Sequence, residues 1–209
     1  MKPFDVTHRV QTQHKAVAFT FDDGPNPVYT PQVLDIFREV GGKATFYMIG
    51  EQIEKEPELA ALVHAQGHEI GNHTYTHPFL TKLSGEAVRN ELRKSESMIQ
   101  DITGKKPVTL RTPYFDVNEE VLSIIEEEGY QLAAGAVNMA AQDWDMPGVD
   151  HIVEKTRESV CNGGIFIFHD GFGDRSQSIE AVRVLAKELT KSGYRLVTVE
   201  ELLTLADPE

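Results

Sequence analysis

The stretch AVAFTFDDGP at residues 16–25 joins a short apolar segment to two adjacent carboxylates and a Gly-Pro turn. A second segment, GIFIF at residues 164–168, is apolar throughout and leads directly into His169. Apolar runs without polar alternation are typical of strands that are buried on both faces of a sheet. Both segments therefore predict strands that are buried on both faces and have polar residues at their carboxyl ends.

Short apolar runs alternate with amphipathic stretches along the whole chain. The runs predict strands near residues 16–21, 44–49, 69–71, 108–110, 131–137, 164–168 and 195–199. Helical patterns lie near residues 31–40, 57–66, 85–102, 119–128, 149–160 and 179–192. This α/β alternation implies parallel strands joined by right-handed crossovers, and seven such units favour a compact (β/α) barrel. An open doubly wound sheet is the alternative, weakened because no Gly-x-Gly-x-x-Gly pattern follows the first strand.

Composition excludes several classes of protein. The chain carries 33 acidic and 20 basic residues, and this net charge of −13 disfavours proteins that coat nucleic acid or anionic membranes. No uncharged apolar run approaches the ~18 residues of a membrane span. Cys161 is the only cysteine, which excludes an intrachain disulfide and a thiolate zinc site. The first fifteen residues show no signal-peptide pattern, so we expect a cytoplasmic protein or a mature domain that has lost an export segment.

Polar side chains follow four of the predicted strands, and carboxyl ends of parallel strands open on one face of a barrel. These side chains are Asp22 and Asp23, His73 and His77, Arg111, and His169. Two histidines four residues apart on a helical turn can present both imidazoles to one zinc ion. A carboxylate from another strand end would complete an Asp/His/His set with an open position for water, which marks a catalytic zinc site. Arg111 could then orient a carboxylate, and His169 could protonate a leaving group.

Five segments resemble, in order and spacing, the motifs of the polysaccharide deacetylases, the NodB-homology domains of carbohydrate esterase family 4. They are TFDDGP at 20–25, HTYTH at 73–77, RTPY at 111–114, DW at 143–144 and FH at 168–169. The resemblance implies a distorted (β/α)7 barrel, which agrees with the seven units counted above. We expect an N-terminal extension at residues 1–15 and a single NodB-homology catalytic domain at residues 16–206.

The resemblance also implies a metal centre. Asp23, His73 and His77 would hold a divalent ion, usually Zn²⁺, with Co²⁺ and other divalent ions as substitutes in the family. These positions match the family motifs residue by residue.

Further roles follow from the same resemblance. Asp22 would be the general base, and Arg111 would hold it ionised and oriented. His169 would be the general acid that protonates the departing amine. The backbone N–H of Tyr114 would stabilise the oxyanion, and Trp144 would wall the acetyl pocket.

Two positions depart from the family pattern. Ala140 stands where the fourth motif commonly has its first acid, so the carboxylate that polarises His169 would be absent or replaced by Asp143 or Asp145. Phe115 stands where the third motif commonly has glycine, and a ring there could narrow the sugar site.

The activity implied is a zinc-dependent hydrolase that removes N-acetyl groups from GlcNAc-type glycans, such as chitooligosaccharide or peptidoglycan, and releases acetate. The alternatives are an O-deacetylase of acetylated xylan and an inactive carbohydrate-binding homologue. A metallophosphatase is disfavoured because the site offers little beyond Arg111 to meet phosphate charge. We expect a monomer with an N-acetylated glycan as its partner and neither nucleic acid nor membrane. The family resemblance favours an extracellular or cell-wall location, with the cytoplasm as the alternative.

Overall fold

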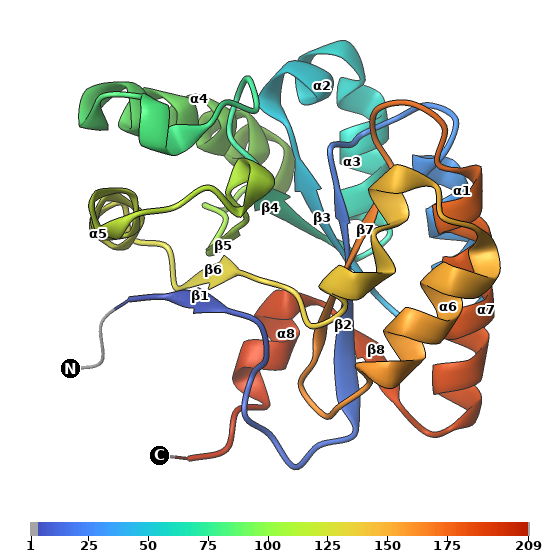
Figure 1. The fold of residues 1–209 in the computed structure, drawn as a ribbon. Coiled ribbons are helices and arrows are strands. Elements are labelled where there is room, and N and C mark those ends of the chain that lie inside the picture. The colour runs from blue at the N-terminus through green and yellow to red at the C-terminus, as the bar shows by residue number, and fades with distance from the viewer. Residues whose placement is uncertain (1–3, 209) are drawn as a thin grey trace.

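A curved sheet of parallel strands forms the centre of the computed structural model, which describes residues 4–208 (Figure 1). The strands are β1 (Val6–Thr7), β2 (Ala16–Asp22), β3 (Thr45–Met48), β4 (Glu69–Asn72), β5 (Thr109–Leu110), β6 (Leu132–Ala134), β7 (Ile165–His169) and β8 (Arg195–Val197). The sheet order is β1-β6-β5-β4-β3-β2-β7, and β8 pairs with the first residues of β2. This half-barrel with helices outside it confirms the expected distorted (β/α)7 barrel.

The two ends of the sheet meet through residues that directly follow β1. Arg9 and Gly164 form an isolated antiparallel bridge, and Val10 N–H donates to the Gly163 carbonyl at 3.0 Å. A regular barrel would be closed here by a continuous ladder of hydrogen bonds between two strands, and this single bridge takes its place. The segment expected as an extension, residues 1–15, thus supplies both β1 and this bridge to the sheet.

Eight helices accompany the strands in the described part of the chain. They are α1 (Thr30–Val40), α2 (Gly50–Lys55), α3 (Pro57–Ala65), α4 (Gly85–Thr103), α5 (Glu119–Glu127), α6 (Val149–Glu158), α7 (Ser176–Lys191) and α8 (Val199–Thr204). Side-chain oxygens of Ser84, Asn118 and Thr198 accept the N–H groups that begin α4, α5 and α8. Over residues 4–208, no helix combines the length and the apolar character that crossing a membrane requires.

The helices surround the sheet unevenly. Figure 1 shows α1, α6 and α7 together on one side and α4 and α5 on the other. Helix α8 packs against the beginning of β2, where Val199 and Leu202 join the same buried cluster as Ala16 and Ala18. This helix fills the amino end of the barrel, so the carboxyl ends of the strands are the open end.

An aromatic core fixes β2 against β7. The Phe19 ring stacks on the Phe168 ring with centroids 5.6 Å apart, and both side chains are fully buried. Burial of each such ring contributes roughly 1.5–3 kcal/mol to stability. The parallel register pairs Asp22 with His169 at the carboxyl end of this core. Packing in the middle of the barrel thereby sets two polar residues beside each other at its open end.

Candidate active site

The loops at the carboxyl ends of the strands enclose a cavity of about 350 Å³. Its lining residues are Asp22, Asp23, His73, His77, Thr112, Tyr114, Phe115, Met139, Trp144, Ile167, His169 and Arg175. The cavity therefore brings together the three candidate metal ligands, Asp23, His73 and His77. The candidate general base, Asp22, and the candidate general acid, His169, line the same cavity. Four short 3₁₀ turns shape these loops: η1 (Leu80–Lys82), η2 (Pro113–Phe115), η3 (Met139–Ala141) and η4 (Asp143–Asp145).

Asp23, His73 and His77 form a compact donor set. Asp23 Oδ1 lies 3.4 Å from His73 Nε2 and 3.2 Å from His77 Nε2, and the three ligand atoms all lie within 4.8 Å of one another. His73 Nδ1 lies 2.7 Å from the Arg111 carbonyl, which only accepts, so Nδ1 carries a hydrogen and Nε2 is the ligand atom. Metal ligation requires a neutral ring, whose Nε2 lone pair faces a carboxylate oxygen.

Two facing acceptors need a cation between them. Asp23 Oδ1 is buried and has no hydrogen-bond partner, which is costly unless an ion binds there. One carboxylate oxygen and two imidazole nitrogens are the ligands of catalytic zinc sites, so the residues fit a divalent cation such as Zn²⁺. Burial alone would raise the pKa of Asp23, but when no cation is bound and the two imidazoles are protonated, their hydrogen bonds and charge outweigh burial and lower that pKa well below its usual range.

The loop that carries the two histidines is not helical, so the expectation of a helical turn is wrong. Residues 73–79 follow β4 as an irregular loop, in which Thr74 has φ 65° and His77 has φ 62°. The Thr74 hydroxyl accepts the His77 N–H at 3.1 Å and folds the chain back. Left-handed backbone at a non-glycine residue costs roughly 1–3 kcal/mol, and here it aims both imidazoles at Asp23.

Arg111 and Asp22 form a buried ion pair beside the donor set. Arg111 Nη1 donates to Asp22 Oδ1 at 2.7 Å, and the arginine side chain is only 1% exposed. The guanidinium also donates to Thr20 Oγ1 and to the carbonyls of Ala134 and Gly135. Because these contacts fix Asp22 Oδ1, the other carboxylate oxygen is held 3.8 Å from His73 Nε2, facing the cavity.

His169 is paired with Asp143. His169 Nδ1 lies 2.9 Å from Asp143 Oδ1. The other oxygen, Asp143 Oδ2, accepts from the backbone N–H of His169 and from the Ser178 hydroxyl, at 2.8 Å each. Burial alone would lower the pKa of His169, but the negative charge and hydrogen bond of Asp143, with Asp22 and Asp23 nearby, raise it to about 9.

Asp145, the other candidate for this carboxylate, and Ala140, where the family commonly has an acid, both lie elsewhere. Asp145 is exposed at the end of η4, and Ala140 is exposed in η3, where its carbonyl accepts from His151 Nε2 at 3.2 Å. The structure therefore places Asp143, and not Asp145, against the histidine ring. That Asp143 tunes the proton affinity of His169 remains a prediction.

The aromatic candidates surround these polar groups. The Trp144 ring stands edge-on to His169 with centroids 5.7 Å apart, and the Tyr114 ring lies 4.6 Å from the His77 ring. Phe115 places its ring 5.7 Å from the Arg111 guanidinium and lines the cavity. The bulky residue at the unusual position is thus part of the wall beside the buried ion pair.

Sequence reasoning missed Arg175, which joins two of the loops. Arg175 Nε donates to the Gly171 carbonyl at 2.8 Å and Nη1 donates to the Trp144 carbonyl at 3.3 Å. It lies in a polar loop without periodicity, so no pattern singled it out.

The loop after β7 packs against the main chain behind the carboxylates. The N–H groups of Asp170 and Gly171 both donate to the Asp22 carbonyl at 3.3 Å. A Cβ on Gly171 would lie 2.0 Å from the Asp23 carbonyl oxygen, so only glycine fits there. Asp170 is fully buried, with one oxygen bonded to the Thr30 hydroxyl and the other unpartnered, and burial raises its pKa to about 7.

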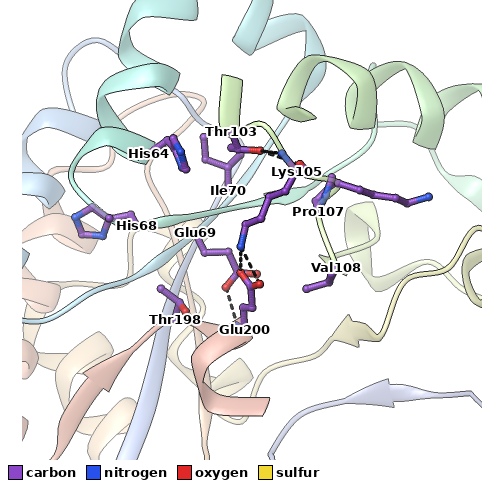
Figure 2. A pocket seen from close by; sticks show the side chains of 12 residues that line it. His64, His68, Glu69, Ile70, Thr103, Lys105, Pro107, Val108, Thr198 and Glu200 are labelled. Carbon is purple, nitrogen blue, oxygen red and sulfur yellow. Dashed lines mark hydrogen bonds and ion pairs between the residues drawn. The ribbon is translucent and has the colours of Figure 1, made fainter. Parts of the chain in front are cut away.

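A second cavity, of about 200 Å³, lies at the amino end of β4 (Figure 2). Lys105 reaches across it to Glu200, with Nζ 2.6 Å from a carboxylate oxygen. Behind them the half-buried Glu69 carboxylate accepts from the hydroxyls of Thr45 and Thr109 and from the Glu200 N–H. The carboxylates are already satisfied by the protein, so this cavity offers no comparable chemistry.

Comparisons with known proteins give relatives along almost the whole chain. The sequence profile described as polysaccharide deacetylase matches residues 9–133. A peptidoglycan-N-acetylglucosamine deacetylase of Bacillus cereus is 40% identical over 198 residues, which cover 95% of this chain and 92% of the relative. A chitooligosaccharide deacetylase of Bradyrhizobium sp. is 33% identical over 200 residues and covers 90% of each chain.

A solved structure is also similar. The Bc1960 peptidoglycan N-acetylglucosamine deacetylase, in complex with 4-naphthalen-1-yl-N-oxidanyl-benzamide, superposes with a TM-score of 0.89 at 30% identity. The match covers 96% of this chain and 94% of that structure. The likeness therefore extends over the sheet and the loops that enclose the cavity.

Proposed function

Because this chain belongs to the polysaccharide deacetylase family, we propose that it is a metal-dependent enzyme that removes N-acetyl groups from GlcNAc-type glycans and releases acetate. The observation that carries the proposal is one cavity that holds a donor set for a divalent ion, a fixed carboxylate and a carboxylate-paired histidine. Metal-assisted hydrolysis of an amide uses a metal ion, a general base and a general acid, and these groups can supply the three roles.

Asp23, His73 and His77 would hold the ion. When bound, a divalent ion such as Zn²⁺ or Co²⁺ supplies Lewis-acid chemistry that activates water and polarises the acetyl carbonyl. The rest of the reaction depends on the chain's own side chains and backbone.

Asp22 would take the proton from the attacking water. Its Oδ1 is held by Arg111, whereas its Oδ2 faces the donor set and is free to accept. The arginine balances the charge of the carboxylate and fixes its direction, so the general base is oriented before substrate binds.

His169 would return a proton to the departing amine. Its Nδ1 is bonded to Asp143, which leaves Nε2 for the leaving nitrogen. Its pKa near 9 keeps the ring protonated at neutral pH, as a general acid requires. The backbone N–H of Tyr114 would donate to the oxyanion, and Trp144 would wall the acetyl group beside His169.

The substrate class is supported by the relatives. Similar proteins are named for peptidoglycan N-acetylglucosamine and for chitooligosaccharides, both of which carry N-acetylated sugars. The similarity to peptidoglycan deacetylases also supports a location at the cell wall, which we propose together with the activity.

Acetate release from a panel of glycans tests the proposal. Zinc-loaded protein is incubated with chitopentaose, peptidoglycan fragments and acetylated xylan, with chelator-treated protein as the control. We expect acetate from at least one N-acetylated glycan and none after metal removal. Acetate from xylan alone would indicate an O-deacetylase, and glycan binding without any acetate would indicate an inactive homologue; either result contradicts the proposal.

A further inference from the structure

Exposed apolar side chains gather at the open end of the barrel. Among the described residues, the large hydrophobic side chains with more than a third of their surface exposed are Val28, Leu62, Phe79, Tyr114, Met139, Met146 and Phe172. Five of them lie on loops that follow β4, β5, β6 and β7, around the cavity of the donor set. A clustered apolar surface beside a site usually marks a binding surface, whereas single exposed residues need no explanation.

Phe79 and Tyr114, which we call the ring pair, stack on each other within this surface. Their ring centroids are 4.1 Å apart and their planes differ by 13°, yet the residues are 50% and 57% exposed. Tyr114 lines the cavity and its ring lies 4.6 Å from the His77 ring, whereas Phe79 is not among the lining residues. The ring pair thus extends from the donor set inside the cavity, through Tyr114, to Phe79 outside the cavity.

The loops that carry the ring pair are joined to each other. Thr81 donates its N–H to Asp116 Oδ2 at 2.8 Å and its hydroxyl to Oδ1 at 2.9 Å. Leu80, next to Phe79, is fully buried and anchors that loop. Tyr114 itself has φ 58°, a left-handed conformation that costs a non-glycine residue free energy. Two aromatic rings are therefore fixed in place with about half of each residue exposed to solvent, and Tyr114 also has a strained backbone. Packing within the fold explains neither the exposure nor the strain.

We propose that the ring pair is a binding site for the pyranose ring next to the one that is deacetylated; this rests on the proposed function. A β-linked GlcNAc ring has equatorial substituents, so its faces carry C–H groups that pack on aromatic rings. The occupant is an uncharged sugar, because among residues 4–208 Arg175 is the only lysine or arginine that lines the adjoining cavity. Preformed rings lose little conformational entropy when the sugar binds.

Binding of chitopentaose to the zinc-loaded Asp22→Asn variant, in which turnover is slowed at least about 100-fold, tests this site by calorimetry. In that background, Phe79→Ala should raise the Kd about 5–10-fold, the range expected for one aromatic stacking contact. Phe79→Tyr should restore the affinity, because it restores the ring. Leu62→Ala is the matched control: Leu62 is 44% exposed but lies on α3, and its removal should leave the Kd unchanged.

The outcomes separate the ring pair from the activity. An unchanged Kd in Phe79→Ala, or no measurable binding of chitopentaose with the ring pair intact, overturns the ring-pair site. Acetate release by the unmodified enzyme is measured independently, so a failure of the proposed function appears there instead. If Phe79→Ala loses its zinc or its folded circular dichroism spectrum, Phe79→Leu replaces it, and a Kd equal to that of Asp22→Asn alone then overturns the proposal.

Discussion

Replacing Asp143 with asparagine should shift the alkaline limb of the kcat/KM profile to lower pH. Asparagine keeps the size of the side chain and an oxygen that can accept from His169 Nδ1. It removes the charge, and its amide nitrogen cannot accept from the His169 backbone N–H as Asp143 Oδ2 does. The pKa of His169 is about 9 because the charge and hydrogen bond of Asp143, supported by the nearby carboxylates, exceed the opposing effect of burial. Without that charge, burial should return the pKa to about 6.5 or below.

The size of the effect follows from the protonated fraction. At pH 8 an imidazole with a pKa of about 9 is roughly 90% protonated, and one with a pKa of 6.5 is only about 3% protonated. Activity that requires the imidazolium should therefore fall by up to about 30-fold at pH 8 and much less at pH 6. A bound divalent ion offsets part of the charge on Asp22 and Asp23, which lowers the alkaline limb of both proteins.

The assay is the pH dependence of kcat/KM for acetate release by zinc-loaded protein. Asp145→Asn is the control, since Asp145 is exposed and the ring nitrogen of His169 is bonded to Asp143 instead. An alkaline limb that stays in place in Asp143→Asn, while His169→Ala still abolishes activity, would refute the tuning argument. Near-full activity of His169→Ala would refute the acid role itself.

Three further predictions concern the metal, the general base and stability. His73→Ala or His77→Ala should lose bound zinc and turnover, and full zinc occupancy by elemental analysis would be contrary to the ligand assignment. Asp22→Asn should keep the metal and lose about 10²–10⁴-fold in kcat, whereas Asp23→Asn should lose metal; equal metal loss in both would remove the distinction between the two aspartates. The raised pKa of Asp170 means that its stabilising effect is present below its unfolded pKa and lost as pH rises through about 7. Asp170→Asn should therefore raise the Tm at pH 8.5 by several degrees relative to the unmodified protein and by clearly less at pH 5, and equal shifts at both pH values would contradict this.

The strands and long helices were predictable because they bury apolar residues with a clear pattern. Strands β2 and β7 are continuous apolar runs, and amphipathic periodicity marked α4 and α7. Helices α2 and α8 have six residues each, too few for periodicity, and β1 has two. Strand β1 is defined by its pairing with β6, which is distant in the sequence, so no local pattern could predict it.

Residue types at strand ends predicted which side chains meet, but not how they are held. The loop of His73 and His77 is irregular because Thr74 and the left-handed backbone shape it, and spacing alone suggested a helix. The contact of Asp143 with His169 joins residues 26 positions apart through η4 and β7. Loop geometry of this kind depends on tertiary packing, which leaves no periodic signal in a single sequence.

Acetate and free amine can be measured together during incubation of zinc-loaded protein with chitopentaose, with the Asp22→Asn variant in parallel. Metal-dependent N-deacetylation predicts equimolar acetate and amine from the unmodified protein and at most about one hundredth of that rate from the variant. No acetate from the fully zinc-loaded protein, or the same rate in both proteins, would contradict it.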